Sequence, residues 1–146
     1  MRLHWLVAGS LAGCIHGPTW TPDGSCEVAA APRDQDRACA ARRTQGSRDA
    51  GGSSAGSVWG SVWDKCSGEP LPGGTVVADA PGLQGGERTA LTDECGIYEI
   101  QDLPALRYGV SFYYGDVIVG RSAQVSAGQR TELSQALEPS HARGEI

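Results

Sequence analysis

Residues 91–106 read L-T-D-E-C-G-I-Y-E-I-Q-D-L-P-A-L, and this stretch decides the fold. The D-E-C-G part is typical of a tight turn, because Gly96 supplies a backbone geometry that other residues resist. The following I-Y-E-I-Q alternates, with Tyr98 and Ile100 on one face, which is the period of a strand. Pro104 ends the strand, because proline cannot donate to a β-ladder. The stretch therefore predicts a hairpin at the centre of an all-β module.

Further strand patterns lie on both sides of this hairpin. The strongest covers residues 108–114, Y-G-V-S-F-Y-Y, in which every second side chain is apolar. Short runs of this kind, separated by glycine-rich turns, are typical of a sandwich. We expect an all-β fold, a single small antiparallel Greek-key β-sandwich of about seven strands. Its strands are drawn from the runs 58–64, 75–80, 88–92, 97–101, 108–114, 117–119, 123–125 and 131–137.

The first residues carry the features of an export signal. A basic residue at position 2 precedes a short, mostly apolar run, and L-A-G-C follows at residues 11–14. This tetrapeptide resembles the lipobox of bacterial lipoproteins, which implies that Cys14 receives lipid and becomes the mature N-terminus. Ile15 stands where an aspartate would favour inner-membrane retention, so we expect an outer-membrane lipoprotein, periplasmic or surface-exposed. An ordinary signal peptide with a chance cysteine, or a misassigned start codon, is the alternative.

The chain divides into four parts. Residues 1–13 are expected to be the lipoprotein signal peptide, and residues 14–57 the lipidated cysteine and a flexible linker rich in proline, glycine and serine. Within this linker, residues 34–43 are compatible with a short helix. Residues 57–138 form the predicted sandwich, and residues 139–146 a disordered tail.

Four cysteines are left once Cys14 is assigned to lipid. They are Cys26, Cys39, Cys66 and Cys95, and an even number in an exported chain predicts two disulfides. Three pairings are open. We favour Cys66–Cys95 in the domain and Cys26–Cys39 in the linker, because turns at one end of a sandwich cluster in space.

No pattern typical of an active site is present. The histidines are His4, His16 and His141, so the domain lacks a base for serine or cysteine catalysis. No cysteine pair has the spacing of a zinc site. The acidic residues in turns have two alternative functional interpretations, a calcium site or a catalytic acid pair. Solvated turn acids are the simpler interpretation, and we expect no enzyme activity, metal or cofactor. These carboxylates belong to Asp64, Asp93, Glu94, Asp102 and Asp116.

Charge and aromatic content narrow the partners. Residues 58–146 carry six basic and twelve acidic side chains, a net charge of −6 that repels phosphate backbones and argues against nucleic acid. Trp59, Trp63 and Tyr113 are the candidate binding face for a sugar or a protein. The alternation places Trp59 and Trp63 on one side of their strand. If that side points inward, they belong to the core instead.

Four motifs carry a family resemblance. They are G-S-V-W-D at 60–64, G-E-P-L-P-G-G-T-V at 68–76, T-D-E-C-G-I-Y-E-I at 92–100 and L-P-A-L-R-Y-G-V at 103–110. In this order they resemble the carboxypeptidase regulatory-like domain, of transthyretin-like (prealbumin-like) fold. The resemblance implies an accessory sandwich, found beside peptidase domains and in surface proteins, generally without catalytic residues. The fold is also grouped with carbohydrate-binding-like folds, although fold alone does not establish binding.

Two functions follow as expectations. The first is a non-catalytic, lipid-anchored cell-envelope module that mediates structural or protein–protein interactions with an unknown envelope protein. The alternative is a carbohydrate-binding module that takes a glycan on an aromatic face of the sandwich.

Overall fold

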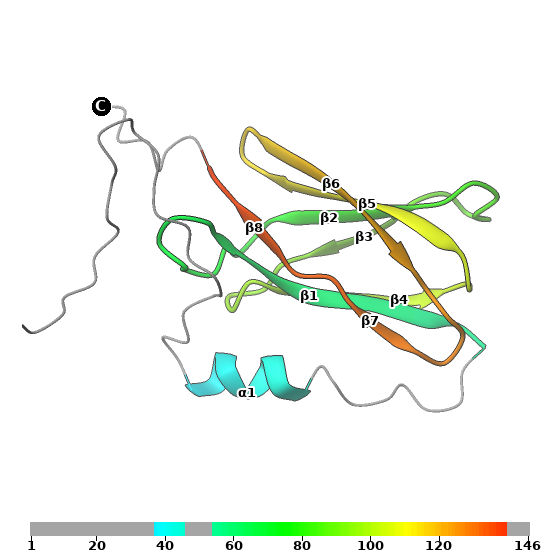
Figure 1. The fold of residues 1–146 in the computed structure, drawn as a ribbon, viewed down its shortest axis with the longest axis horizontal. Coiled ribbons are helices and arrows are strands. Elements are labelled where there is room, and N and C mark those ends of the chain that lie inside the picture. Colours follow the sequence, from blue (N-terminus) through cyan, green and yellow to red (C-terminus); the bar gives the residue numbers. More distant parts are fainter. Residues whose placement is uncertain (1–36, 46–53, 140–146) are drawn as a thin grey trace, which may run out of the picture.

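The computed structural model describes residues 37–45 and 54–139, which form one short helix beside two β-sheets (Figure 1). The elements are α1 (Arg37–Gln45), β1 (Gly56–Asp64), β2 (Thr75–Asp79), β3 (Arg88–Leu91), β4 (Ile97–Leu103), β5 (Arg107–Tyr114), β6 (Val117–Gln124), β7 (Arg130–Glu132) and β8 (Gln135–Leu137).

The two sheets have four strands each. In the first, β1 lies between β4 and the pair β7 and β8, and the second has the order β3-β2-β5-β6. The predicted β-sandwich is therefore confirmed. The pairing is mainly antiparallel, as predicted, and the exceptions are β7 and β8, which are both parallel to β1. The long path from β1 to β7 gives the chain room for the crossover that a parallel pair requires.

The last predicted strand, 131–137, is split in two at Leu133. The Leu133 backbone lies against Gly60 of β1, where an added Cβ would lie 2.3 Å from the Leu133 carbonyl oxygen. That carbonyl accepts the hydroxyl of Tyr98, and the Leu133 N–H donates to the Trp59 carbonyl at 2.8 Å. This local irregularity separates β7 from β8, which pair with the same edge of β1 in one register. In contrast, the runs 117–119 and 123–125, predicted as separate strands, belong largely to one continuous β6.

The core lies between the two sheets. As the alternation predicts, Tyr98 and Ile100 of β4 are buried, and so are Val110 and Phe112 of β5. The rings of Tyr98 and Phe112 meet edge to face with centroids 5.6 Å apart. Val58, Val62, Leu71, Val76, Ala78, Ala80, Leu103, Tyr108, Ala123, Val125, Leu133 and Leu137 complete this cluster.

The turn before β4 is built as its sequence predicts. The Asp93 carboxylate oxygen Oδ1 accepts the backbone N–H groups of Cys95 and Ile97, both at 2.9 Å. Gly96 has φ +69°, and an added Cβ there would lie 2.4 Å from the Val62 carbonyl oxygen. Glycine is thus required for backbone conformation and for space, and the turn presents Cys95 beside β1.

Candidate functional site

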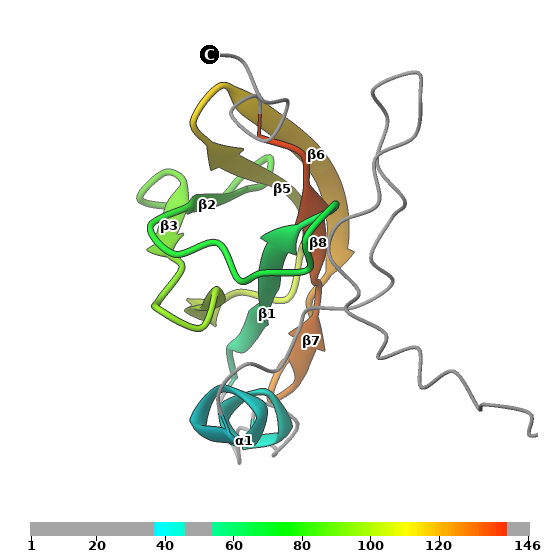
Figure 2. The ribbon, with the colours of Figure 1, turned by 90° about the vertical axis from the view of Figure 1, so that its left-hand side faces the viewer.

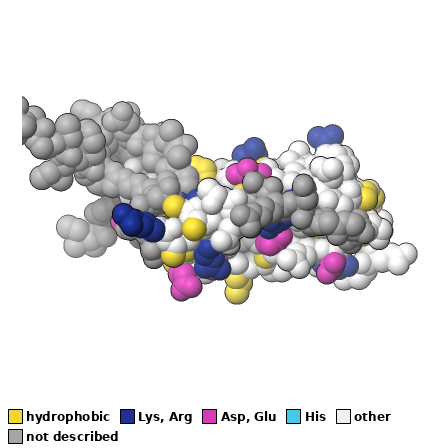
Figure 3. Space-filling model, turned by 90° about the horizontal axis from the view of Figure 1, so that it is seen from below, with side chains coloured by type: hydrophobic (Ala, Val, Ile, Leu, Met, Phe, Trp, Pro, Cys, Tyr) yellow, Lys and Arg dark blue, Asp and Glu magenta, His cyan; other side chains and the backbone are white. Residues whose placement is uncertain are grey.

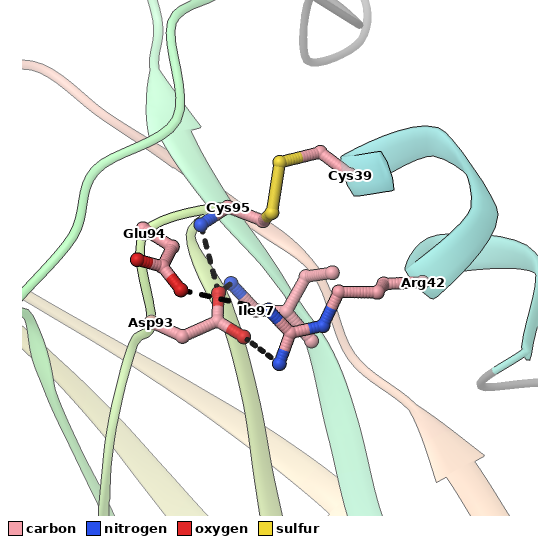
Figure 4. A network of polar contacts seen from close by, with 6 residues as sticks. All are labelled: Cys39, Arg42, Asp93, Glu94, Cys95 and Ile97. Carbon is pink, nitrogen blue, oxygen red and sulfur yellow. Dashed lines mark hydrogen bonds and ion pairs between the residues drawn. A yellow bond between two sulfur atoms is a disulfide. The ribbon is translucent and has the colours of Figure 1, made fainter. Parts of the chain in front are cut away.

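A disulfide joins the helix to the sandwich. Cys39 of α1 is bonded to Cys95, with the two Cα atoms 5.3 Å apart (Figure 4). The predicted Cys66–Cys95 pairing is therefore wrong, and Cys39 is not available to Cys26. Cys66 is also disulfide-bonded, and its partner lies outside the described residues, as do Cys14 and Cys26.

The physical reason lies in the register of β1 and β4. Ser61 pairs with Ile97, so the turn that carries Cys95 lies level with the last third of β1. Cys66 lies beyond the end of β1, where its N–H donates to the Asp64 carboxylate at 2.7 Å. Both cysteines occupy the same end of the sandwich, as predicted. Position at one end does not select the partner, however, because α1 places Cys39 closer.

The helix overlaps the short helix expected within residues 34–43, but its attachment to the sandwich was not predicted. Part of the segment predicted as a flexible linker, residues 14–57, is α1, which lies beside the first sheet in two perpendicular views (Figures 1 and 2). Arg42 pairs with Asp93 at 3.0 Å and reaches Glu94 at 4.0 Å (Figure 4). Asp93 therefore uses one carboxylate oxygen for its own turn and the other for the helix.

A cleft of about 460 Å³ lies between α1 and the first sheet. On its floor, the guanidinium of Arg130 donates to Glu99 Oε1 at 2.8 and 3.1 Å. The same guanidinium carbon lies 5.5 Å from the centroid of the Trp59 ring, a cation–π arrangement. The cleft is lined by Arg42, Gln45, Trp59, Leu91, Asp93, Ile97, Tyr98, Glu99 and Arg130.

The three predicted aromatic residues do not form one face. Trp59 is only 6% exposed, on the side of β1 opposite the core residues Val58 and Val62. Trp63 is half-buried, and among the described residues its indole N–H is buried without a hydrogen-bond acceptor. Tyr113 belongs to β5 in the other sheet and is 41% exposed. Alternation placed each residue on its strand, but it carried no information on which sheet each strand joins.

A second surface lies on the outer face of the β3-β2-β5-β6 sheet. Register places Leu91, Thr75, Tyr113 and Ile118 in one row across all four strands. Leu91 and Ile118 are 65% and 66% exposed. The neighbouring row on the same face is Thr89, Val77, Ser111 and Gly120. We call these two rows the uncharged face, because they contain no Asp, Glu, Lys, Arg or His.

Sequence reasoning missed several of these residues. Ile118 sits in the run V-I-V, where both strand faces are apolar and the exposed one cannot be told apart. Glu99 and Arg130 are 31 positions apart, and no spacing rule connects them. Only the alternation in β4, which set Glu99 opposite Tyr98, pointed to a polar outer side.

Turn carboxylates do not converge in the described part of the chain. Asp64 Oδ1 accepts the N–H groups of Cys66 and Ser67, and Asp93 caps its own turn. Among residues 37–45 and 54–139, no three side chains of the His, Cys, Asp and Glu types lie together as a metal site would require. The three histidines fall outside these ranges, and so do the predicted signal peptide and lipid anchor.

The sequence profile of the carboxypeptidase regulatory-like domain matches residues 57–138, more than half of the chain. The chain belongs to the carboxypeptidase regulatory-like domain family. The matched range begins at the second residue of β1 and ends one residue after β8, so it covers both sheets of this regulatory-like domain and excludes α1. The resemblance seen in the four motifs is confirmed.

Solved structures share this fold. The TIE protein of Bacillus anthracis aligns with a TM-score of 0.50 and 20% identity over 58% of this chain and 16% of its own. BcpA, the major pilin subunit of Bacillus cereus, aligns with a TM-score of 0.47 and 17% identity. The alignment covers 58% of this chain and 30% of BcpA. A Bacteroides uniformis protein to which carbohydrate binding is attributed aligns with a TM-score of 0.44 and 20% identity. The alignment covers 58% of this chain and 41% of that protein. The chain thus spans less than half of each of these proteins.

No curated protein matches the chain. In the described part of the chain, no helix combines the length and apolar character needed to cross a membrane.

Proposed function

We propose that the chain is a non-catalytic, lipid-anchored cell-envelope module that mediates protein–protein interactions through the uncharged face. The anchor is the lipid on Cys14, and the compartment is the outer membrane with the sandwich periplasmic or surface-exposed. Membership of a regulatory-like domain family supports a binding role over a catalytic one.

The observation that carries this proposal is the contrast in charge. Residues 58–146 have a net charge of −6. The two adjacent rows of the uncharged face nevertheless contain no charged side chain. Leu91, Tyr113 and Ile118 present apolar surface to solvent in the same row. Uncharged aromatic and aliphatic groups of this kind form the buried centre of protein interfaces, where charged residues are depleted.

Site-specific photo-crosslinking in cells tests this face. We expect a benzoylphenylalanine side chain at Tyr113 or Ile118 to capture a discrete envelope protein, whereas the same group at the exposed position Gln101 does not. The adduct at Tyr113 disappears when Ile118→Asp is added, because a buried charge without a partner opposes association. Equal capture at Gln101, or no dependence on Ile118→Asp, would contradict the proposal.

The anchor needs its own test. The mass of the protein extracted from membranes is expected to equal that of a chain that starts at Cys14 and carries acyl groups. The variant Cys14→Ser is expected in the soluble fraction. An unlipidated mass would remove the anchor and leave a soluble exported domain.

A second function, glycan binding, is supported by the cleft rather than by the predicted aromatic face. Arg130 and Glu99 offer donors and acceptors side by side over Trp59, and Leu91 and Ile97 add apolar surface. Sugar hydroxyls match such paired polar groups, and a pocket of this kind is the usual form of a small-ligand site. Retention on peptidoglycan or polysaccharide beads that falls in Glu99→Gln would support this function, and no retention would oppose it.

A further inference from the structure

We propose that the Cys39–Cys95 disulfide holds α1 as a covalent cover over the cleft, and that opening this bond exposes a glycan-binding surface formed by Trp59, Glu99 and Arg130. The identity of the ligand rests on the second proposed function. The cover does not, since it follows from how α1 is attached.

Apolar burial does not hold α1 in place. Its sequence is R-A-C-A-A-R-R-T-Q, and none of its nine residues is buried. Isolated helices shorter than about 12–15 residues are marginal in water. A helix of this length and composition has neither an apolar face to bury nor enough propensity to persist alone, so its attachment must come from specific contacts.

The non-covalent contacts are polar. Arg42 pairs with Asp93 at 3.0 Å, but the Arg42 side chain is 49% exposed, and such exposed pairs contribute little. The second contact, from Arg130 to the Gln45 carbonyl, is long at 3.4 Å. Among the coloured side chains visible from this side, basic and acidic groups are intermixed with scattered hydrophobic ones (Figure 3). Arg43 adds a buried guanidinium that interacts with Asp93, so the disulfide is the covalent link among several polar ones.

The groups beneath α1 are not part of the core. Trp59 points away from the core cluster, yet only 6% of it is exposed. The Arg130 side chain is 17% exposed and that of Glu99 31%, although both are charged. A tryptophan and an ion pair placed under a polar helix are well suited to a ligand with hydroxyl groups and C–H surfaces, once the helix has moved.

Opening the cover is a two-electron reduction by a dithiol, such as a thiol–disulfide oxidoreductase. Its thiolate attacks the sulfur of Cys39, which is partly exposed, whereas Cys95 is 3% exposed. The Cys39–Cys95 bond breaks as a mixed disulfide forms, and the second thiol of the reductant then releases Cys39. Cys39 and Cys95 end as thiols with the two electrons and two protons, and the reductant ends as a disulfide.

The cover is tested by arginine modification on the full chain. Phenylglyoxal labelling, read by peptide mass spectrometry, is compared for Arg130 in the wild type and in Cys39→Ala/Cys95→Ala. The exposed Arg121 serves as the reference in the same molecule. We expect Arg130 to be labelled at least about fivefold faster in the variant, because the covalent link that holds the helix over it is then absent. Arg42→Ala, with its disulfide intact, is expected to keep the slow rate.

An unchanged rate at Arg130 would overturn the cover, whatever the ligand. If the double variant is too unstable to study, Cys39→Ser is measured instead, and an unchanged Arg121 rate shows that the sandwich is intact.

Ligand binding is measured separately with an N-acetylglucosamine oligosaccharide. We expect the double variant to bind it at least about tenfold more tightly than the wild type, a difference of about 1.4 kcal/mol, and Glu99→Gln to lose this gain. Equal binding by both forms would overturn control of access. Faster labelling without binding by either form would overturn the glycan function and leave the cover standing.

Discussion

The two outer faces of the sandwich are completed in opposite ways. The β4-β1-β7 face places charged groups and Trp59 outside the core and covers them with a basic helix attached by a disulfide. The β3-β2-β5-β6 face carries no acidic or basic side chain in its two central rows and leaves Leu91 and Ile118 about two-thirds exposed. The difference teaches that the first face is stabilised by contacts within the chain, whereas the second is free to contact another molecule.

Removal of the Cys39–Cys95 bond is expected to have the largest effect on stability. The two residues are 56 positions apart, so the chain-entropy treatment gives a loss of about 4 kcal/mol. Urea unfolding of Cys39→Ala/Cys95→Ala measures it, with Cys66 and its own disulfide untouched. A loss below about 1 kcal/mol would mean that the covered face gains little from its covalent link.

Gly96→Ala is expected to come next. The substitution forces an alanine into φ +69° and places its Cβ against the Val62 carbonyl, which we expect to cost about 3 kcal/mol. The matched control is Gly115→Ala, which has φ +58° but open space around the added Cβ, so it carries only the backbone cost. Equal losses in thermal unfolding would show that the close approach to β1 is unimportant.

Tyr98→Phe is expected to have a smaller, pH-dependent effect. It removes the hydrogen bond to the Leu133 carbonyl, a loss of about 1 kcal/mol. Burial raises the pKa of Tyr98 above its unfolded value of about 10, so the folded state disfavours the ionised form. The wild type therefore keeps this stability below pH ~10 and loses it as the pH rises further. Urea titrations at rising pH should show a steeper loss for the wild type than for Tyr98→Phe, and parallel curves would refute the assignment.

Ile118→Ser is expected to have the smallest effect on stability. The side chain is 66% exposed and contributes little to the core, so the change should stay within about 0.5 kcal/mol. The same substitution should nevertheless clearly reduce photo-crosslinking of the partner protein at Tyr113. This combination of effects separates the uncharged face from the covered one. A large loss of stability would show that Ile118 packs within the chain and is not free for a partner.

Local sequence patterns predicted those structural features that have a local physical cause. The turn at Gly96, the buried Tyr98 and Ile100, and the strand at 108–114 all follow from steric limits or from a period of two along the chain. The disulfide partner of Cys95 could not be predicted from such local patterns. It depends on the position in the folded chain of a helix that lies more than fifty residues earlier in the sequence.

The outer faces were beyond the same reasoning. Whether Trp59 shares a cleft with other residues depends on where α1 lies, and whether Tyr113 has an exposed neighbour in Ile118 depends on the register of β5 and β6. Neither fact has a signature in the spacing of residues, because both arise when separate segments meet.

The amino-acid sequence by itself determined the class of fold, the family and the positions of the core side chains, since alternation and turn chemistry act over a few residues. Only the tertiary structure decided the parallel partners of β1, the Cys39–Cys95 link, the burial of Trp59 and the row from Leu91 to Ile118. Each of these depends on register and on contacts between distant segments, which form only when the whole chain has folded.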